Sequence, residues 1–179
     1  MRAARRVPKR DWKHVYGHDG DLGRRAAEAM AALHDGTATA LPAWRRYTGV
    51  VWEHLDPSTL TKAQRRRIVV VSALLGVVGG EEPVPDHRLK LSVSLPRLGR
   101  LDRWWRPVVT EHLRGLGRGP IVDLLPKEHA AAVDWDELRR DREVLRPDLP
   151  AVTGHAGKAA KGLLARRLLV EGVGIVRDP

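Results

Sequence analysis

The chain has 179 residues, of which 42% are hydrophobic and 30% charged, and this balance predicts one globular domain of mixed composition. It has no cysteine, which excludes disulfides, a thiolate nucleophile and cysteine-ligated zinc. Lysine and arginine exceed aspartate and glutamate by 32 to 22, and the net charge of +10 favours polyanionic partners, unless a coding bias has scattered positive charge over the surface.

The N-terminal residues 1–19 are basic and lack a hydrophobic period. We therefore expect a flexible basic arm at 1–19, followed by a single domain over residues 20–179. The longest apolar run, residues 68–78, is too short to span a bilayer, and no run of signal-peptide length follows the basic start. The sequence thus predicts a cytoplasmic protein that does not enter a membrane.

Two helices are expected in the first third of the chain. The first begins at Asp21, has apolar residues at helical spacing, and stops near Gly36. The second begins at Thr61, which forms a capping box with Gln64.

The β-branched residues 68–71 predict a strand that is buried on both faces of a sheet and delivers Ser72 to the sheet end. Alternating apolar residues over 87–95 predict another strand. The following segment, 101–113, is expected to form a helix with Trp104, Val108 and Leu113 turned inward.

Toward the C-terminus we expect a strand at 121–125, a short helix capped by Asp134, a long helix over 158–170 and a small edge strand at 172–176. Strands that alternate with helices predict a mixed α/β (α+β) fold, with a central sheet covered by helices. The strand order cannot be read from the pattern.

Standard catalytic motifs are absent from the sequence, including the Walker loop, G-x-G-x-x-G, G-x-S-x-G and HExxH. His14 and His18 are four residues apart, but Gly17 interrupts the helix that would align them on one face. No metal site and no cofactor is therefore predicted.

Several collinear segments of the sequence resemble the peroxide-stress YaaA family. They are YTGVVW (47–52), VSALLGVV (71–78), VPDHRL (84–89), SLPRLG (94–99), WWRP (104–107), IVDL (121–124) and HAGKAAKG (155–162). The resemblance covers about residues 41–176, and the order of the segments makes chance agreement improbable. No segment before Gly36 resembles the strand and turn with which family members begin, so we interpret the chain as a divergent member that lacks them.

The resemblance implies a mixed α/β fold and a cytoplasmic protein that limits oxidative and iron-dependent damage, with DNA binding attributed to the family. It also implies site residues. Arg88, His155 and Lys158 keep the residue type of the family, and Lys161 keeps the charge. Together with Ser72 and Glu82 they are expected to line one cleft, with Arg166 as a further cation on the last helix.

Three functions follow as alternatives. The first is a stress protein without catalytic activity that binds duplex DNA. The second is an enzyme that acts on a phosphorylated or anionic small molecule, with Glu82 and His155 as candidate catalytic groups. The third is a truncated, inactive remnant of the family. A purely structural role is also open, in which Arg88 pairs with Glu82, and Lys158 and Lys161 form the wet face of a helix. The sequence does not predict the oligomeric state.

Overall fold

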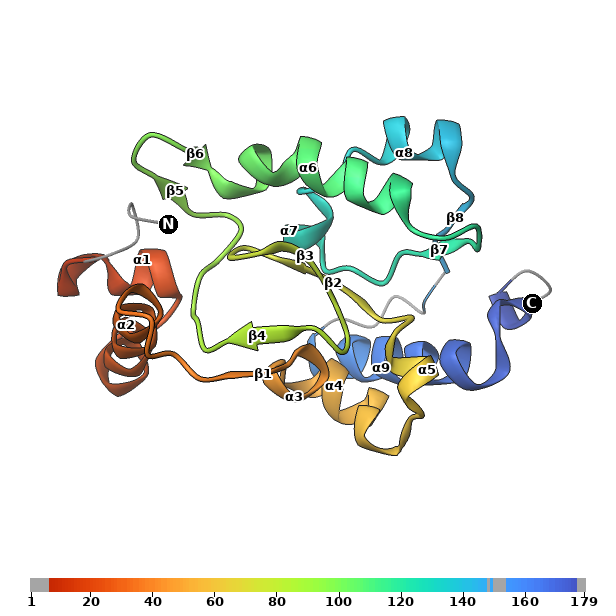
Figure 1. Cartoon of the computed structure of the whole chain (residues 1–179), viewed down its shortest axis with the longest axis horizontal. Coiled ribbons are helices and arrows are strands. Elements are labelled where there is room, and N and C mark those ends of the chain that lie inside the picture. The colour runs from red at the N-terminus through yellow and green to blue at the C-terminus, as the bar shows by residue number, and fades with distance from the viewer. Residues whose placement is uncertain (1–6, 148, 150–153, 177–179) are drawn as a thin grey trace.

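The computed structural model describes residues 7–147, 149 and 154–176, and Figure 1 shows how their elements are arranged. The helices are α1 (Trp12–Tyr16), α2 (Gly20–His34), α3 (Ala43–Arg46), α4 (Val50–Leu55), α5 (Lys62–Arg65), α6 (Leu101–Gly115), α7 (Lys127–Ala130), α8 (Trp135–Asp141) and α9 (Gly154–Glu171). The strands are β1 (Ala40–Pro42), β2 (Val69–Ser72), β3 (Gly76–Gly79), β4 (Pro83–Pro85), β5 (Ser94–Leu95), β6 (Gly99–Arg100), β7 (Ile121–Val122) and β8 (Val144–Leu145). The predicted mixed α/β class is confirmed.

The strands of the described residues form four separate pairs in place of one central sheet. The pairs β1–β4, β2–β3 and β5–β6 are antiparallel, and β7–β8 is parallel. The predicted strand at 68–71 is present as β2, but it forms a hairpin with β3, and only Val71 and Ser72 are buried. Gly76 has φ +75° at the hairpin turn, a backbone conformation that glycine adopts without strain.

The segment that was expected to be a flexible arm contains helix α1 between its described residues 7 and 19. Trp12, Val15 and Tyr16 are spaced as one face of a helical turn, and Val15 and Tyr16 are buried in the main core. The indole nitrogen of Trp12 donates a hydrogen bond to the carbonyl of Val7 at 3.1 Å. Helix α1 is thus a packing element against α2.

Helix α6 supplies much of the main core through Leu101, Val109 and Leu113. Its inward indole is Trp105, which donates to the carbonyl of Ala73 at 2.9 Å in the β2–β3 turn. The prediction that Trp104 and Val108 face inward is wrong, since their exposed fractions are 44% and 57%. The buried stripe of the helix is formed instead by Val109 and Leu113, which are four residues apart. The face that was expected to carry Trp104 and Val108 inward is therefore turned outward.

Residues 87–95 alternate between buried and less buried positions as predicted, but only Ser94 and Leu95 form a strand. Leu91 and Val93 are almost completely buried. Their carbonyls accept hydrogen bonds from the first amides of α6, so the start of a helix takes the place of a partner strand. The predicted edge strand at 172–176 is instead a 3₁₀ turn over Val173–Val176.

The predicted long C-terminal helix is confirmed as α9, which packs against α4. Gly162 lies at their contact. A Cβ atom added to Gly162 would lie 2.7 Å from the Cβ of His54 and would also meet the carbonyl oxygen of Val51. The two helices therefore approach so closely that only glycine fits at this position.

We expect Gly162→Ala to lower the free energy of unfolding by about 1–3 kcal/mol, since the added methyl group forces α9 away from the α4 backbone. Urea denaturation measures the loss. Gly115→Ala is the matched control, because it ends α6 with open space around its Cα and should be neutral or slightly stabilising. Equal stability of both variants would contradict the close packing.

Candidate functional site

Ser72 lies beside the rings of Tyr47, Trp52 and His87. We call these four residues the Tyr47 cluster. The rings of Tyr47 and Trp52 stack with centroids 5.7 Å apart, and His87 meets Tyr47 edge-on at 6.1 Å. The Tyr47 hydroxyl is buried and has no hydrogen-bond partner among the described residues. Burial raises the pKa of Tyr47, and the Ser72 side chain acts in the opposite direction. The Tyr47 phenol is therefore neutral at pH 7 and is buried beside the Ser72 side chain.

His87 connects this cluster to the loop that carries Arg88. Its Nδ1 lies 3.0 Å from the carbonyl of Pro85, which identifies Nδ1 as the protonated nitrogen because a carbonyl can only accept. Burial lowers the pKa of His87, so the ring is neutral at pH 7. The Arg88 guanidinium donates to the carbonyl of His87 at 2.9 Å and lies 3.5 Å from the carboxylate of Asp86, which is equally close to Arg46.

Glu82 does not meet Arg88 or Ser72. Its carboxylate accepts a hydrogen bond from the amide of Gly79 at 2.9 Å, which closes the turn after β3. Gly79 pairs with Val69 at one end of the β2–β3 hairpin, whereas Ser72 lies at the other end. The alternative in which Arg88 pairs with Glu82 is not seen, since Arg88 lies near Asp86, and the structure separates Glu82 from the Tyr47 cluster.

Two of the expected cations on α9 bind main-chain carbonyls. The ammonium group of Lys161 donates to the carbonyls of Leu124 and Leu125 at 3.2 and 2.9 Å. Arg166 binds the end of α4, as described next. His155 and Lys158 are exposed, and neither has a hydrogen-bond or ion-pair partner within the described part of the chain. Within the described part of the chain, Lys161 and Arg166 thus have main-chain partners, whereas His155 and Lys158 have none.

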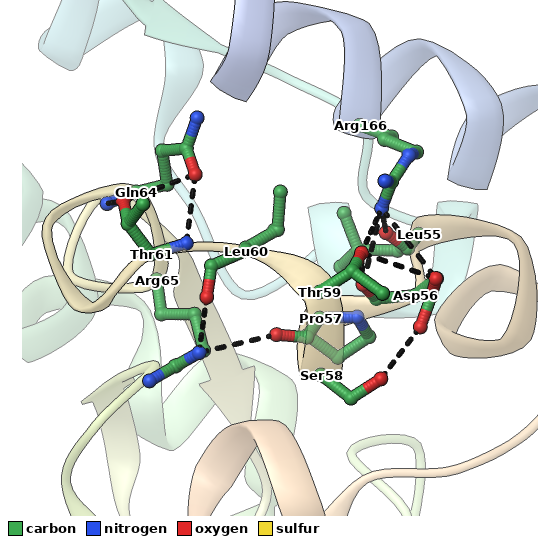
Figure 2. Close-up of polar contacts among 10 residues, drawn as sticks. All are labelled: Leu55, Asp56, Pro57, Ser58, Thr59, Leu60, Thr61, Gln64, Arg65 and Arg166. Carbon is green, nitrogen blue, oxygen red and sulfur yellow. Dashed lines mark hydrogen bonds and ion pairs between the residues drawn. The ribbon is translucent and has the colours of Figure 1, made fainter.

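Figure 2 shows how Arg166 completes the end of α4. Its Nη1 donates to the carbonyls of Leu55 and Asp56, both at 3.1 Å, and to Oγ1 of Thr59 at 2.7 Å. Asp56 has φ +45°, and its carboxylate accepts from the Ser58 hydroxyl, which is the main cause of its lowered pKa. The last carbonyls of a helix have no partner within the helix, so Arg166 supplies one from the far end of the sequence.

The start of α5 has the cap that the sequence predicts. Thr61 and Gln64 form the capping box that starts α5. Arg65 then donates to the carbonyls of Pro57 and Leu60, and its guanidinium binds the Glu81 carboxylate at 2.6 Å (Figure 2 draws the carbonyl contacts). Arg65 therefore links the segment between α4 and α5 to the turn after β3, through the carbonyls of Pro57 and Leu60 on one side and the Glu81 carboxylate on the other.

The described residues contain no group of three or more His, Asp or Glu side chains that could hold a metal ion. Nor does any helix among residues 7–147 and 154–176 combine the length and the apolar composition needed to cross a membrane.

Arg166→Met should lower the free energy of unfolding by about 1–3 kcal/mol, because it leaves the carbonyls of Leu55 and Asp56 without their donor. Chemical denaturation measures the change. Arg167→Met, which removes only an exposed pair with Glu171, should cost at most about 0.5 kcal/mol. The interpretation fails if the two variants lose the same stability.

Stability should decrease as the pH falls through about 6.5, the ordinary value for histidine, because the unfolded chain then binds a proton that folded His87 excludes. The slope from one such group is at most about 1.4 kcal/mol per pH unit. Unfolding curves at pH 5.5 to 7.5 measure it. His87→Asn should reduce the slope, and the part that remains is expected from His129, whose pKa burial also lowers. An unchanged slope in His87→Asn would contradict the assignment.

Comparison with known proteins places these features in a family. A family model described as peroxide stress protein YaaA matches residues 1–178. The match therefore also includes the residues before Tyr47, where the first of the resembling sequence segments begins. A UPF0246 protein of Streptomyces coelicolor is 36% identical over 147 residues, covering 76% of this chain and 56% of the relative. UPF0246 proteins of Corynebacterium glutamicum and Corynebacterium efficiens are 30% and 32% identical, covering 81% and 79% of this chain and 60% of each relative.

The chain thus spans somewhat more than half the length of these curated relatives. Both the family model, which covers nearly all residues, and the relatives at or above 30% identity point to the same assignment. The chain belongs to the peroxide stress protein YaaA family.

Proposed function

We propose that the protein acts in the cytoplasm during peroxide stress and limits oxidative, iron-dependent damage by binding duplex DNA through the cations of α5 and α9. The observation that carries the proposal is a set of exposed cations with no acidic partner among the described residues. Lys62 lies in α5, and Arg66 and Arg67 follow directly after it; we call these three residues the α5 cations. Lys62 and Arg66 are exposed and make no ion pair within that part of the chain. Their charge is available to phosphates.

Arg67 connects this group to α9. Its guanidinium donates to the carbonyls of Leu168 and Leu169 at 3.3 and 3.2 Å. Carbonyl groups orient the guanidinium but do not neutralise it, so Arg67 remains a positive charge held in a fixed position. Such an orientation reduces the side-chain entropy that is lost when a phosphate binds.

Helix α9 adds further positive charge. Its acidic residue, Glu171, pairs with Arg167 at 3.0 Å, while Lys158 and Lys161 form no ion pair with a carboxylate of the described residues. Cations without an ion pair among the described residues also lie on other helices, such as Arg25 on α2 and Arg103 on α6, whereas Arg24 on α2 is paired with Asp21 and Glu28. The cations of α5 and α9 differ in that the two helices are in contact and Arg67 joins them.

This arrangement suggests how DNA binding relates to oxidative damage. Cations that bind the DNA backbone release the counterions condensed on it. Ferrous ions held on phosphates would be among the released counterions, so bound protein would move the source of radicals away from the bases and sugars.

The double variant Lys62→Ala with Arg66→Ala should bind duplex DNA about tenfold more weakly at low salt. It should also reduce the slope of log K against log salt by about 2, since two phosphate contacts are lost. Fluorescence anisotropy over a salt series measures both quantities. Arg25→Ala with Lys127→Ala removes the same charge from α2 and α7 and is the control. Absent or salt-independent binding of the wild-type protein would refute the proposal.

A further inference from the structure

Helix α6 presents an apolar stripe on its outer face. Trp104 and Val108 are 44% and 57% exposed, and they lie one helical turn apart. Pro107 and Val108 line a shallow groove together with Glu111 and His112. An exposed tryptophan beside an apolar groove is a feature of interaction surfaces, since such groups gain most when a second surface excludes water.

Opposite charges lie at the two ends of this stripe. At the N-terminal end, Arg103 is exposed and has no ion pair among the described residues, while its neighbour Arg100 is neutralised by Asp102. At the C-terminal end, Arg114 contacts the carboxylates of Glu111, Glu137 and Asp141. These three carboxylates outnumber the two guanidinium groups at this end, Arg114 and Arg142, and the Glu111 side chain is 70% exposed.

These charges are placed symmetrically about the middle of the stripe. Arg103 lies four residues before Pro107, and Glu111 lies four residues after it. If a second α6 crosses the first in antiparallel orientation at Pro107, each Arg103 meets the Glu111 of the other copy, because a two-fold contact places the same residues on both sides. The same operation sets Trp104 over the groove at Val108. A face with this pattern is complementary to itself.

We propose that two copies of this chain associate through the outer faces of α6, antiparallel and centred at Pro107. A single helix face from each copy is smaller than the roughly 1,600 Å² of a typical stable interface, so the dimer is a weak one that forms at micromolar concentrations. In Figure 1, α6 lies on one side of the molecule and α5 with α9 on the opposite side. The dimer therefore leaves the α5 cations exposed on both copies.

Sedimentation velocity of the purified chain over a range from about 1 to several hundred micromolar tests the proposal, since a weak interface of this size dissociates within that range. We expect a concentration-dependent rise from the monomer toward the dimer. Val108→Glu should raise the dissociation constant at least tenfold. Val170→Glu places the same charge at an equally exposed apolar position on α9 and should leave association unchanged. Far-UV circular dichroism confirms that both variants fold.

Charge-reversal variants distinguish this contact from nonspecific hydrophobic association. Arg103→Glu and Glu111→Arg should each weaken self-association, because each places like charges opposite one another in both symmetric contacts. A mixture of the two variants should associate, since a heterodimer of one copy of each has opposite charges facing one another in both contacts. Monomeric wild-type protein at all concentrations, or a mixture that stays monomeric while wild type dimerises, would overturn the proposal.

Discussion

The close contact between α4 and α9 at Gly162 is the constraint on which the placement of the cations depends. Because the α9 backbone lies against Val51 and His54, the residues that follow one turn later are fixed relative to the end of α4. Arg166 therefore reaches the carbonyls of Leu55 and Asp56. Further along α9, the carbonyls of Leu168 and Leu169 orient Arg67, so the contact also determines where the α5 cations lie.

The short strands explain why so many arginines bind the main chain. Strands of two to four residues leave many carbonyls at loop and helix ends without a partner in a sheet. Arg142 donates to the carbonyls of Leu113, Arg114, Leu116 and Gly119, and Arg106 donates to Ala131. Guanidinium groups with five donors each are suited to this role. Part of the high arginine content is thus a structural requirement of the fold, separate from any binding of polyanions.

Local features of the sequence were predicted well and distant ones were not. The capping box at Thr61 and the cap at Asp134 depend on residues three positions apart, and both are present. The inward face of α6 was misjudged because its phase is set by contact with the β2–β3 hairpin. Lys161 and Arg166 were expected to bind anions, since nothing in the sequence shows that their partners are carbonyls 36 and 110 positions away. An enzymatic role for Glu82 and His155 stays a prediction.

The contacts of Arg166 and Arg67 also set the order in which the chain can fold. Each joins α9 to a segment more than 100 residues earlier in the chain. During synthesis, the end of α4 leaves the ribosome long before its hydrogen-bond donor exists, and closing so large a loop is slow. The α4–α5 region can therefore complete these hydrogen bonds only after α9 has been made, and its final ordering is coupled to the docking of α9.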